Sequence, residues 1–321
     1  MPRIKYAVFW LLAAMLIAMP VVLAEIYLRS QGLGDPILFY SNASYRFAPQ
    51  PNQKQSRLRG ASVTIDSKGL RSTRDWSRRA DAKILFIGDS VTWGGTYIDD
   101  QDTFAEGVCQ RIGKASGKDV VCGNAGTNQY GTDNMAARIR YRDFDDETAL
   151  VVTMISPDTV RGLAEADGRF FFMQPPPPPF RALGEAVTYL AWRLYQALRP
   201  VSYRGDDDRR VAERSLENLY AAIRETGRPG RKVLLVLSPF EAELDGHEGW
   251  LTREVQASLA RSGFDVLDLH GAVSREPRAG FYYDSVHLEA RGHHFYAEQI
   301  SERLMATMGE SLRAQPLTHA E

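Results

Sequence analysis

The sequence has no excess of charge of either sign and no long run of basic residues. Its 321 residues include 39 Lys and Arg against 40 Asp and Glu, a formal net charge of −1. A nucleic-acid-binding protein normally presents a basic patch, so this balance argues against nucleic acid as a partner. No internal repeat is visible either. The 44% of hydrophobic residues suffices for one large or two small globular domains and excludes a disordered chain.

Cysteine is scarce, since the chain has only Cys109 and Cys122. In an exported protein an even count suggests a disulfide, and closing this short loop would stabilise the fold by about 3 kcal/mol. Two buried free thiols explain the same count equally well, because the sequence gives no distance between them. In either case we interpret the pair as structural.

One long hydrophobic run stands near the N-terminus. Residues 6–24 carry no charge, follow Arg3 and Lys5, and precede Glu25. As a helix they would span about 28 Å, close to the hydrocarbon thickness of a bilayer. A cleaved signal peptide is the alternative, although its apolar core is usually shorter. We expect residues 1–28 to be an inner-membrane anchor, with the basic residues in the cytoplasm and the rest of the chain in the periplasm or another extracytoplasmic space.

From residue 83 on, short apolar runs alternate with amphipathic stretches. This alternation is typical of β-α-β units, in which helices connect buried parallel strands. We expect strands at residues 84–87, 120–122, 150–155, 233–237 and 266–267. Helices are expected at residues 103–114, 132–141, 209–225, 253–262 and 289–308. The predicted fold is an α/β domain over residues 81–312, a three-layer α/β/α sandwich around a five-stranded, mostly parallel sheet.

Two segments and a short tail, residues 313–321, fall outside this alternation. Residues 29–80 show little periodicity, and we interpret them as a juxtamembrane stalk that packs onto the domain near residues 63–70. Residues 158–208 form an insertion that contains five consecutive prolines and then an amphipathic stretch. An insertion of this length is usually a lid, a substrate wall or a surface for a protein partner, although a rigid spacer explains it equally well.

A serine follows the first predicted strand. Ligands of open α/β sheets bind beyond the carboxyl ends of the strands, which is where Gly88, Asp89 and Ser90 lie. The buried strand supports Ser90 rigidly, and the glycine permits a tight exit turn. A serine hydroxyl is a weak nucleophile that needs a base oriented by a third group. Asp284 and His287, on the same side of a helical turn, provide such a pair.

Three motifs together resemble the GDSL-type, or SGNH, hydrolase superfamily. They are Gly-Asp-Ser at residues 88–90, Asn-Ala-Gly at residues 124–126, and an Asp-x-x-His that ends at His287. They occur in the family's order, and the resemblance covers residues 83–308. It implies a flavodoxin-like sheet and an acyl-enzyme mechanism that uses neither a metal nor an organic cofactor. Ser90 would be the nucleophile, His287 the base, and Asp284 the acid that orients His287.

The same resemblance implies an oxyanion hole. Its donors would be the N–H groups of Ser90 and Gln129, or of Gly131 if the turn is shifted. The family's third motif, which contributes an Asn side chain, is altered here, because Pro157 stands at that position. Loss of one oxyanion donor costs about 2.7 to 4 kcal/mol of transition-state stabilisation. We expect Asn128 to substitute, with Thr127 and Ser156 as alternatives, and otherwise a slow enzyme or no hydrolase at all.

Several further side chains lie near these motifs in the sequence. Trp93, Tyr97 and Tyr130 flank the predicted site, and we assign Trp93 and Tyr130 to substrate binding by stacking on a sugar ring, although ordinary packing explains them as well. His293 and His294 have no carboxylate or cysteine at ligand spacing, so we expect packing or surface roles for them and no metal.

The sequence thus predicts a membrane-anchored, extracytoplasmic serine esterase that hydrolyses small O-acyl esters, with an O-acetyl group on a polysaccharide as the first expectation. The expected partners are this acylated glycan, or another small ester, and the bilayer around residues 6–24. An O-acyltransferase that uses the same serine is one alternative. A catalytically weak glycan-binding or assembly protein is another, motivated by Pro157 and by the insertion.

Overall fold

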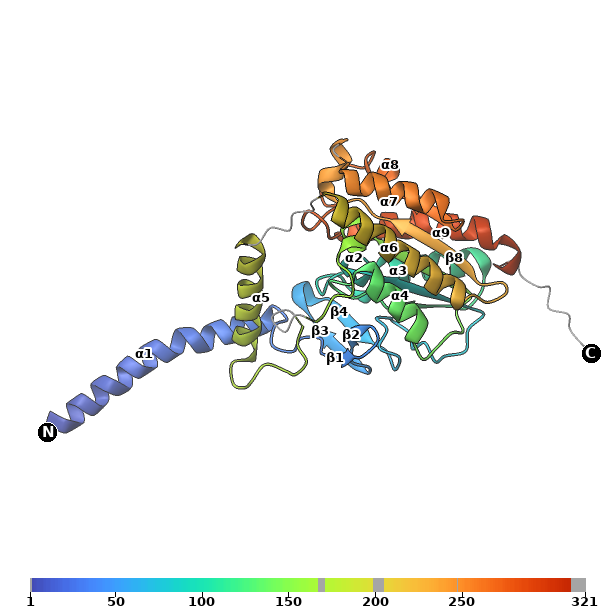
Figure 1. Ribbon diagram of the computed structural model, residues 1–321. Coiled ribbons are helices and arrows are strands. Elements are labelled where there is room, and N and C mark those ends of the chain that lie inside the picture. Colours follow the sequence, from blue (N-terminus) through green and yellow to red (C-terminus); the bar gives the residue numbers. More distant parts are fainter. Residues whose placement is uncertain (1, 167–170, 199–204, 247, 313–321) are drawn as a thin grey trace, which may run out of the picture.

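A computed structural model describes residues 2–166, 171–198, 205–246 and 248–312. Within them, a five-stranded sheet lies between two layers of helices (Figure 1). Its strands are β5 (Ala82–Gly88), β6 (Val120–Asn124), β7 (Ala149–Met154), β8 (Lys232–Leu237) and β9 (Asp265–Asp268), in the order β6-β5-β7-β8-β9. All neighbouring strands are parallel. The predicted three-layer sandwich is therefore confirmed.

The central strand β5 shows why the sequence signal is a continuous apolar run. Every residue of β5 is buried. Because side chains alternate along a strand, Leu85 and Ile87 enter the hydrophobic core on one face of the sheet, and Ile84 and Phe86 enter the core on the other. A parallel strand covered on both faces has no polar side to interrupt the pattern.

Five helices flank the sheet close to their predicted positions. On one face, α3 (Phe104–Ser116) packs against α9 (Ala290–Leu312). On the other face lie α4 (Thr132–Tyr141), α6 (Gly205–Glu225) and α7 (Trp250–Arg261). The ends of α3 illustrate how the sequence sets helix bounds. The Thr103 hydroxyl accepts a hydrogen bond from the Glu106 N–H at its start, and Gly117, with a φ of 69°, ends it.

The segment before the sheet is more than the stalk that we expected. It forms two hairpins, β1 (Phe39–Asn42) with β2 (Arg46–Pro49) and β3 (Gln53–Ser56) with β4 (Ser62–Ile65). Its residues Phe39, Phe47, Val63 and Ile65 are part of the main core. These four-residue strands are too short to give a recognisable periodic signal.

Helix α1 (Pro2–Ser30) is the apolar segment at the N-terminus. Its residues Phe9–Ser30 are long and apolar enough to cross a membrane, and few of them are buried against the rest of the chain. Figure 1 shows α1 running away from the globular body. A signal sequence near the N-terminus passes the same test of length and apolar composition, although its apolar core is usually shorter.

Cys109 and Cys122 form a disulfide with their Cα atoms 5.9 Å apart. The bond ties α3 to the neighbouring strand β6 within the core below α9. Of the two readings left open by the sequence, the structure has the disulfide. Because such bonds persist mainly in oxidising compartments, it agrees with an exported domain.

The predicted insertion contains one long helix. It begins in the short 3-10 helix η3 (Ser156–Val160) and includes α5 (Arg181–Leu198), which packs against α1. Parts of the insertion, residues 167–170 and 199–204, lie outside the described residues. Its assignment as a lid, wall, partner surface or spacer therefore depends on what α5 contacts.

Candidate active site

The Gly-Asp-Ser motif connects β5 to the short helix α2 (Ser90–Trp93). Asp89 caps this helix, and its Oδ1 accepts a hydrogen bond from the Val91 N–H at 2.9 Å. Ser90 is consequently the first residue of α2, just beyond the carboxyl end of β5, where ligands of such sheets bind. The helix ends at Gly94, which has a φ of 89° that glycine adopts without strain.

Two glycines let the surrounding backbone close around α2. A Cβ atom at Gly88 would overlap the Thr92 hydroxyl and the Thr153 carbonyl of β7. A Cβ at Gly126 would lie 2.6 Å from the backbone nitrogen of Trp93. Gly88 is thus required by close packing and not by the turn that we predicted, since its φ is not positive.

The His287 ring lies within hydrogen-bond distance of both Ser90 and Asp284. The His287 Nε2 atom is 2.9 Å from the Ser90 Oγ atom. The other ring nitrogen, Nδ1, is 2.8 Å from Oδ2 of Asp284 and 3.0 Å from its Oδ1. This is the arrangement in which an imidazole removes the proton of a serine hydroxyl while a carboxylate orients the ring. All three side chains reach solvent, so a substrate can approach them.

The loop that carries this pair is built by Asp284 itself. Its Oδ1 accepts hydrogen bonds from the Val286 and His287 N–H groups, each at 2.9 Å, and the Tyr283 N–H donates to the His287 carbonyl at 2.7 Å. We expected a helical turn, but this is a side-chain-stabilised loop between short bridged segments. It brings the carboxylate and the imidazole together all the same.

The electrostatics of the pair keep Asp284 ionised. Burial raises the pKa of its carboxyl, but the hydrogen bond and charge of His287 and the two backbone N–H groups outweigh burial and bring the pKa to about 2. Near neutral pH the side chain of Asp284 is therefore a carboxylate, which can accept a hydrogen bond from Nδ1–H of His287 and would stabilise a positive charge on that ring.

The loop after β6 lies beside Ser90. The side chain of Asn124 fixes this loop, because its Nδ2 donates to the Thr92 carbonyl and its Oδ1 accepts from the Gly126 N–H. Gln129 has a φ of 66°, a left-handed backbone conformation that glycine adopts more readily than other residues. Within the described residues, neither the Ser90 N–H nor the Gln129 N–H donates to another group. The half-buried side chain of Asn128 precedes Gln129.

The altered third motif lies in η3, next to a buried carboxylate pair. Pro157 is in the first turn of η3 and has no N–H to donate. Asp158 is fully buried and accepts the Ile155 N–H at 3.0 Å, and it is ion-paired with Arg161 at 2.9 Å. Burial, together with the nearby charge of Asp89, raises its pKa well above the ordinary value. Burial likewise raises the pKa of Asp89, which the Arg161 charge opposes.

Our assignment of Trp93 and Tyr130 to substrate binding is wrong, because both side chains are buried. The side chains of Trp93 and Tyr130 are 1% and 0% exposed. Trp93 packs on Phe39, and the Tyr130 hydroxyl donates to the Phe47 carbonyl. The N-terminal hairpin that covers them was not visible in the sequence, so neither ring can stack on a sugar.

An aromatic pair beside Asp284 is exposed instead. The ring of Tyr283, 43% exposed, stacks on that of Tyr97 with centroids 4.0 Å apart. The Arg59 guanidinium lies 5.1 Å from the centroid of the Tyr283 ring and 5.6 Å from that of the Tyr97 ring. Both carboxylate oxygens of Glu289 accept hydrogen bonds from it at 3.0 Å. Only Tyr97 was among the sequence candidates. Tyr283 directly precedes Asp284 of the Asp-x-x-His motif, so its position was a signal that could have found it, whereas Arg59 lies in a segment without a motif.

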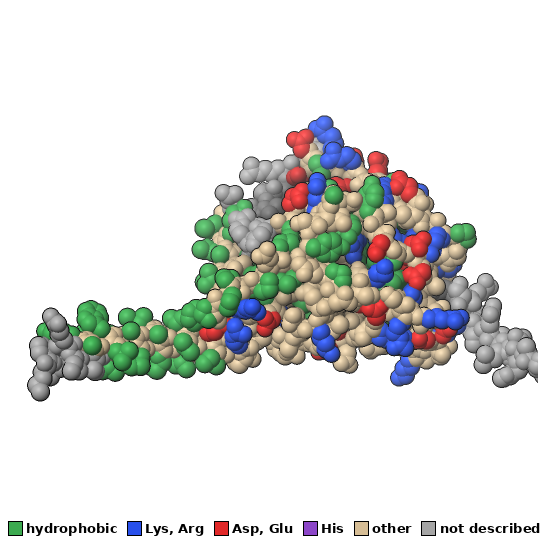
Figure 2. Space-filling view, turned by 90° about the horizontal axis from the view of Figure 1, so that it is seen from below, with side chains coloured by type: hydrophobic (Ala, Val, Ile, Leu, Met, Phe, Trp, Pro, Cys, Tyr) green, Lys and Arg blue, Asp and Glu red, His purple; other side chains and the backbone are tan. Residues whose placement is uncertain are grey.

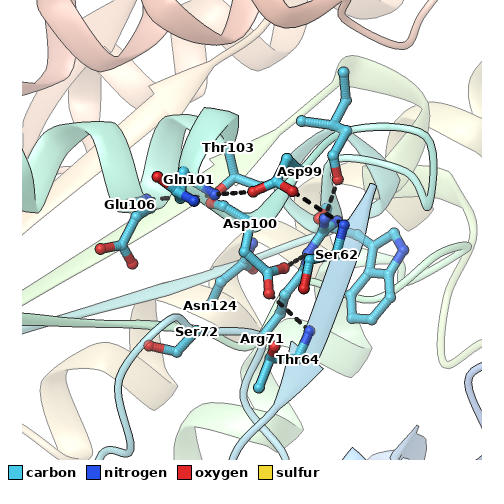
Figure 3. A network of polar contacts seen from close by, with 12 residues as sticks. Ser62, Thr64, Arg71, Ser72, Asp99, Asp100, Gln101, Thr103, Glu106 and Asn124 are labelled. Atoms are coloured by element: carbon cyan, nitrogen blue, oxygen red, sulfur yellow. Dashed lines mark hydrogen bonds and ion pairs between the residues drawn. The ribbon is translucent and has the colours of Figure 1, made fainter. Parts of the chain in front are cut away.

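Arg71 holds the chain at the end of α2 in place, and nothing in the sequence pointed to it. Its buried guanidinium binds Asp100 at 2.8 Å and donates to the Trp93 and Gly95 carbonyls, at 2.8 Å and 2.6 Å. Figure 3 shows how Asp100 in turn accepts the Thr64 N–H of β4. A single arginine therefore joins the chain after α2 to the hairpin and to the loop at Asp100.

The two consecutive histidines of α9 have other partners. His293 is buried, its Nδ1 accepts the Phe104 N–H at 3.2 Å, and burial lowers its pKa to about 3. His294 lies on the surface, 3.2 Å from Asp102. Among the described residues there is no group of three metal-ligating side chains.

The sequence matches no family model and no curated protein. Solved structures do resemble the fold. A lipase/acylhydrolase from Enterococcus faecalis is 16% identical, with a TM-score of 0.46 over 70% of this chain and 96% of its own. A lipolytic protein of the G-D-S-L family from Veillonella parvula is 14% identical, with a TM-score of 0.42 over 69% and 97%. An acetyl-xylooligosaccharide esterase from Geobacillus Stearmophilus is 14% identical, with a TM-score of 0.43 over 73% and 97%. At these values the similarity carries no weight in assigning chemistry.

Proposed function

We propose that the protein is a serine esterase of the GDSL-type, or SGNH, hydrolase superfamily. The observation that carries the proposal is the 2.9 Å contact between the Ser90 Oγ and the His287 Nε2, continued to Asp284 at 2.8 Å. A base and an orienting carboxylate in this order are what a serine hydroxyl needs in order to attack an ester.

The reaction follows from these contacts. The Ser90 Oγ attacks the ester carbonyl while His287 Nε2 takes the hydroxyl proton, and Asp284 stabilises the resulting imidazolium. The N–H groups of Ser90 and Gln129, with the Asn128 side chain, bind the oxyanion. His287 then returns its proton to the leaving alcohol, which leaves an acyl-Ser90 ester. A water molecule, deprotonated by His287, hydrolyses this ester and releases the acid.

The proposed substrate is a small O-acyl ester on a polysaccharide, with acetyl as the first choice. Two features support a sugar: the exposed Tyr283 ring and the guanidinium of Arg59, both beside the loop that holds His287. Aromatic faces bury the apolar side of a sugar ring, and a guanidinium donates to its hydroxyl groups.

The proposed location is the extracytoplasmic side of a membrane. The length and apolar composition of α1 support a membrane anchor, and Arg3 and Lys5 before it support a cytoplasmic N-terminus. The Cys109–Cys122 disulfide supports an oxidising compartment for the domain.

The test uses the full chain in detergent, as wild type and as Ser90→Ala. We expect wild type to react with a fluorophosphonate probe and to hydrolyse p-nitrophenyl acetate, and we expect Ser90→Ala to do neither. A wild type that is folded but neither reacts nor hydrolyses would refute the esterase. Acyl transfer to an added glycan at a rate exceeding hydrolysis would instead identify an acyltransferase that uses the same serine.

A further inference from the structure

Helix α5 (Arg181–Leu198) has one face fastened to the protein and one face bare. On the fastened face, Glu185 and Arg57 form an ion pair in which both side chains are at most 1% exposed, and Glu185 also accepts the Gly34 N–H at 2.7 Å. On the bare face, four apolar side chains repeat at helical spacing. Val187, Leu190, Leu194 and Leu198 are 62%, 69%, 60% and 72% exposed. So large an apolar stripe normally has a binding partner.

The start of α5 is attached directly to α1. The carboxylate of Glu25, near the C-terminal end of α1, accepts the N–H groups of Ala182 and Leu183 at 3.1 Å and 2.9 Å. Arg29, one turn further along α1, donates to the same carboxylate at 2.7 Å. These contacts satisfy the free N–H groups at the start of α5 and fix the angle between the two helices.

That angle is wide. In Figure 1, α1 leaves the globular body on the side where α5 lies, and α5 runs across the direction of α1. Figure 2 shows hydrophobic side chains continuing from α1 onto the adjoining edge of the body. If α1 crosses the bilayer, a helix that crosses its exit point at a wide angle lies along the bilayer surface.

We propose that α5 lies in the membrane interface, with Val187, Leu190, Leu194 and Leu198 inserted among the lipids. The occupant of the bare face is therefore the same bilayer that α1 crosses, and the proposal rests on α1 being a retained anchor. Trp192 and Tyr195, stacked at 6.1 Å and partly exposed, flank the stripe and suit the headgroup level. An amphipathic helix with this composition typically binds in the interface plane.

This placement turns the active site toward the membrane. On the inner side of α5, the Tyr189 side chain lies beside those of Arg57 and Thr96. Thr96 precedes Tyr97, the ring that stacks on Tyr283 beside the catalytic loop. A helix resting on lipid thus holds the substrate side of the domain close to the bilayer, where an acylated glycan attached to a lipid, or emerging through the membrane, would meet it.

The experiment measures the depth of α5 in the full chain reconstituted into phosphatidylcholine vesicles. Both native cysteines are in the disulfide, so Val187→Cys introduces the one thiol for a nitrobenzoxadiazole label. We expect blue-shifted emission and at least twofold quenching by doxyl-labelled lipid. The control label at Glu302→Cys, on the exposed side of α9, should be neither shifted nor quenched. Adding Leu190→Glu and Leu194→Glu should abolish the quenching at position 187.

Each other outcome overturns the proposal in a recognisable way. If the vesicles carry the protein on flotation but the label at position 187 is no more quenched than the control, α5 does not touch lipid. If its emission shifts with protein density and not with doxyl lipid, a second copy of the chain covers the stripe. If the protein does not float with the vesicles, the anchor fails as well. Reaction of Ser90 with the fluorophosphonate probe is scored separately, so a failure of the esterase is distinguished from all three.

Discussion

The Nε2 atom of His287 lies 2.9 Å from the Oγ atom of Ser90, although 197 positions separate the two residues in the sequence. The contact depends on two separate local structures. Asp89 caps α2 and fixes Ser90 at the end of β5, and Asp284 closes the loop that holds His287. The sheet brings the two together, because both lie beyond the carboxyl ends of its strands.

The first prediction concerns Asp284. Replacing Asp284 by Asn removes the charge that stabilises the imidazolium and favours the wrong tautomer of His287. We expect kcat for p-nitrophenyl acetate to fall by about 10⁴-fold, with little loss of stability because the side chain is partly exposed. Stopped-flow or long-time assays of the purified variant measure the fall.

Since the Asp284 pKa is about 2, wild-type activity lost between pH 7 and pH 4 must come from protonation of another group. If the midpoint of the activity–pH profile between pH 7 and pH 4 shifts when Asp284 is replaced and with no other substitution, the low pKa of Asp284 is contradicted.

The second prediction concerns the missing third-motif donor. If the Asn128 side chain binds the oxyanion, Asn128→Ala lowers kcat by about 10²- to 10³-fold and leaves KM nearly unchanged. Steady-state kinetics measure the two parameters separately. An unchanged kcat would exclude Asn128. The alternatives named from the sequence, Thr127 and Ser156, are buried, and Ser156 is hydrogen-bonded with Thr252. The next candidate would then be Arg161, whose Nη1 lies 3.4 Å from the Tyr130 carbonyl, so Arg161→Gln is measured in parallel.

The third prediction concerns the backbone packing around α2. Gly126→Ala places a Cβ 2.6 Å from the Trp93 nitrogen, so the loop after β6 must move away from Ser90. We expect a loss of about 1–3 kcal/mol in the free energy of unfolding and a large loss of kcat. Chemical denaturation and esterase assays measure both. The matched control is Gly271→Ala, because a Cβ at Gly271 meets no atom within 4 Å. Equal stability of the two variants would show that the loop tolerates the extra atom.

The sequence predicts the sheet and its helices well because both depend on burial of regular faces. The predicted helix at residues 132–141 matches α4, and the predicted strand at 84–87 lies within β5. The residues of the candidate triad were also named from the sequence, because each belongs to a compact motif. The structure brings the three side chains together, although the local turns at Gly88 and His287 differ from the predicted ones. Their catalytic roles stay predictions until the enzyme is assayed.

What the sequence did not predict depends on contacts between distant segments. Trp93 and Tyr130 follow the motifs and were taken as exposed, yet Phe39 and Phe47 of the N-terminal hairpins cover them. The Tyr97–Tyr283 pair joins residues 186 positions apart with no shared pattern. Buried Arg71 likewise has no local signature, because its partners Trp93, Ile98 and Asp100 lie 22 to 29 positions further along the chain.

The fourth prediction concerns the pH dependence of stability. His270, in α8 (His270–Val273), lies 2.6 Å from Asp268 and 3.1 Å from Glu243. Burial lowers the His270 pKa, but its hydrogen bonds to Asp268 and Glu243 outweigh burial and raise it from 6.5 to about 9. The folded state thus binds the proton more tightly than the unfolded state. The stabilisation is complete below pH 6.5 and is lost as the pH rises toward 9.

At 1.36 kcal/mol per pKa unit, His270 contributes at most about 3 kcal/mol, and solvent screening reduces this to about 1–2 kcal/mol. Urea denaturation at pH 6 and pH 9.5 measures the difference for wild type and for His270→Gln. Between pH 6 and pH 9.5 we expect the free energy of unfolding of the wild type to fall by about 1–2 kcal/mol more than that of His270→Gln. Parallel curves for the two proteins would refute the contribution of His270.

The last prediction concerns the exposed aromatic pair as a sugar-binding platform. Tyr283→Ala removes the ring stacked on Tyr97 but leaves the backbone of the catalytic loop. We expect KM for an acetylated oligosaccharide to rise about 10-fold, as the loss of about 1.4 kcal/mol of stacking implies. The kcat/KM for p-nitrophenyl acetate should stay within about twofold, since this small ester does not reach the platform.

The matched control is Tyr141→Ala, because Tyr141 is 60% exposed and belongs to α4 rather than to the catalytic loop. It should leave both substrates unaffected. A fall of both activities in Tyr283→Ala would mean that the ring positions Asp284 and His287 and does not bind sugar. A rise in KM confined to the oligosaccharide separates substrate recognition from catalysis, because the two substrates share the same acyl-enzyme and differ only in the alcohol that the protein must hold.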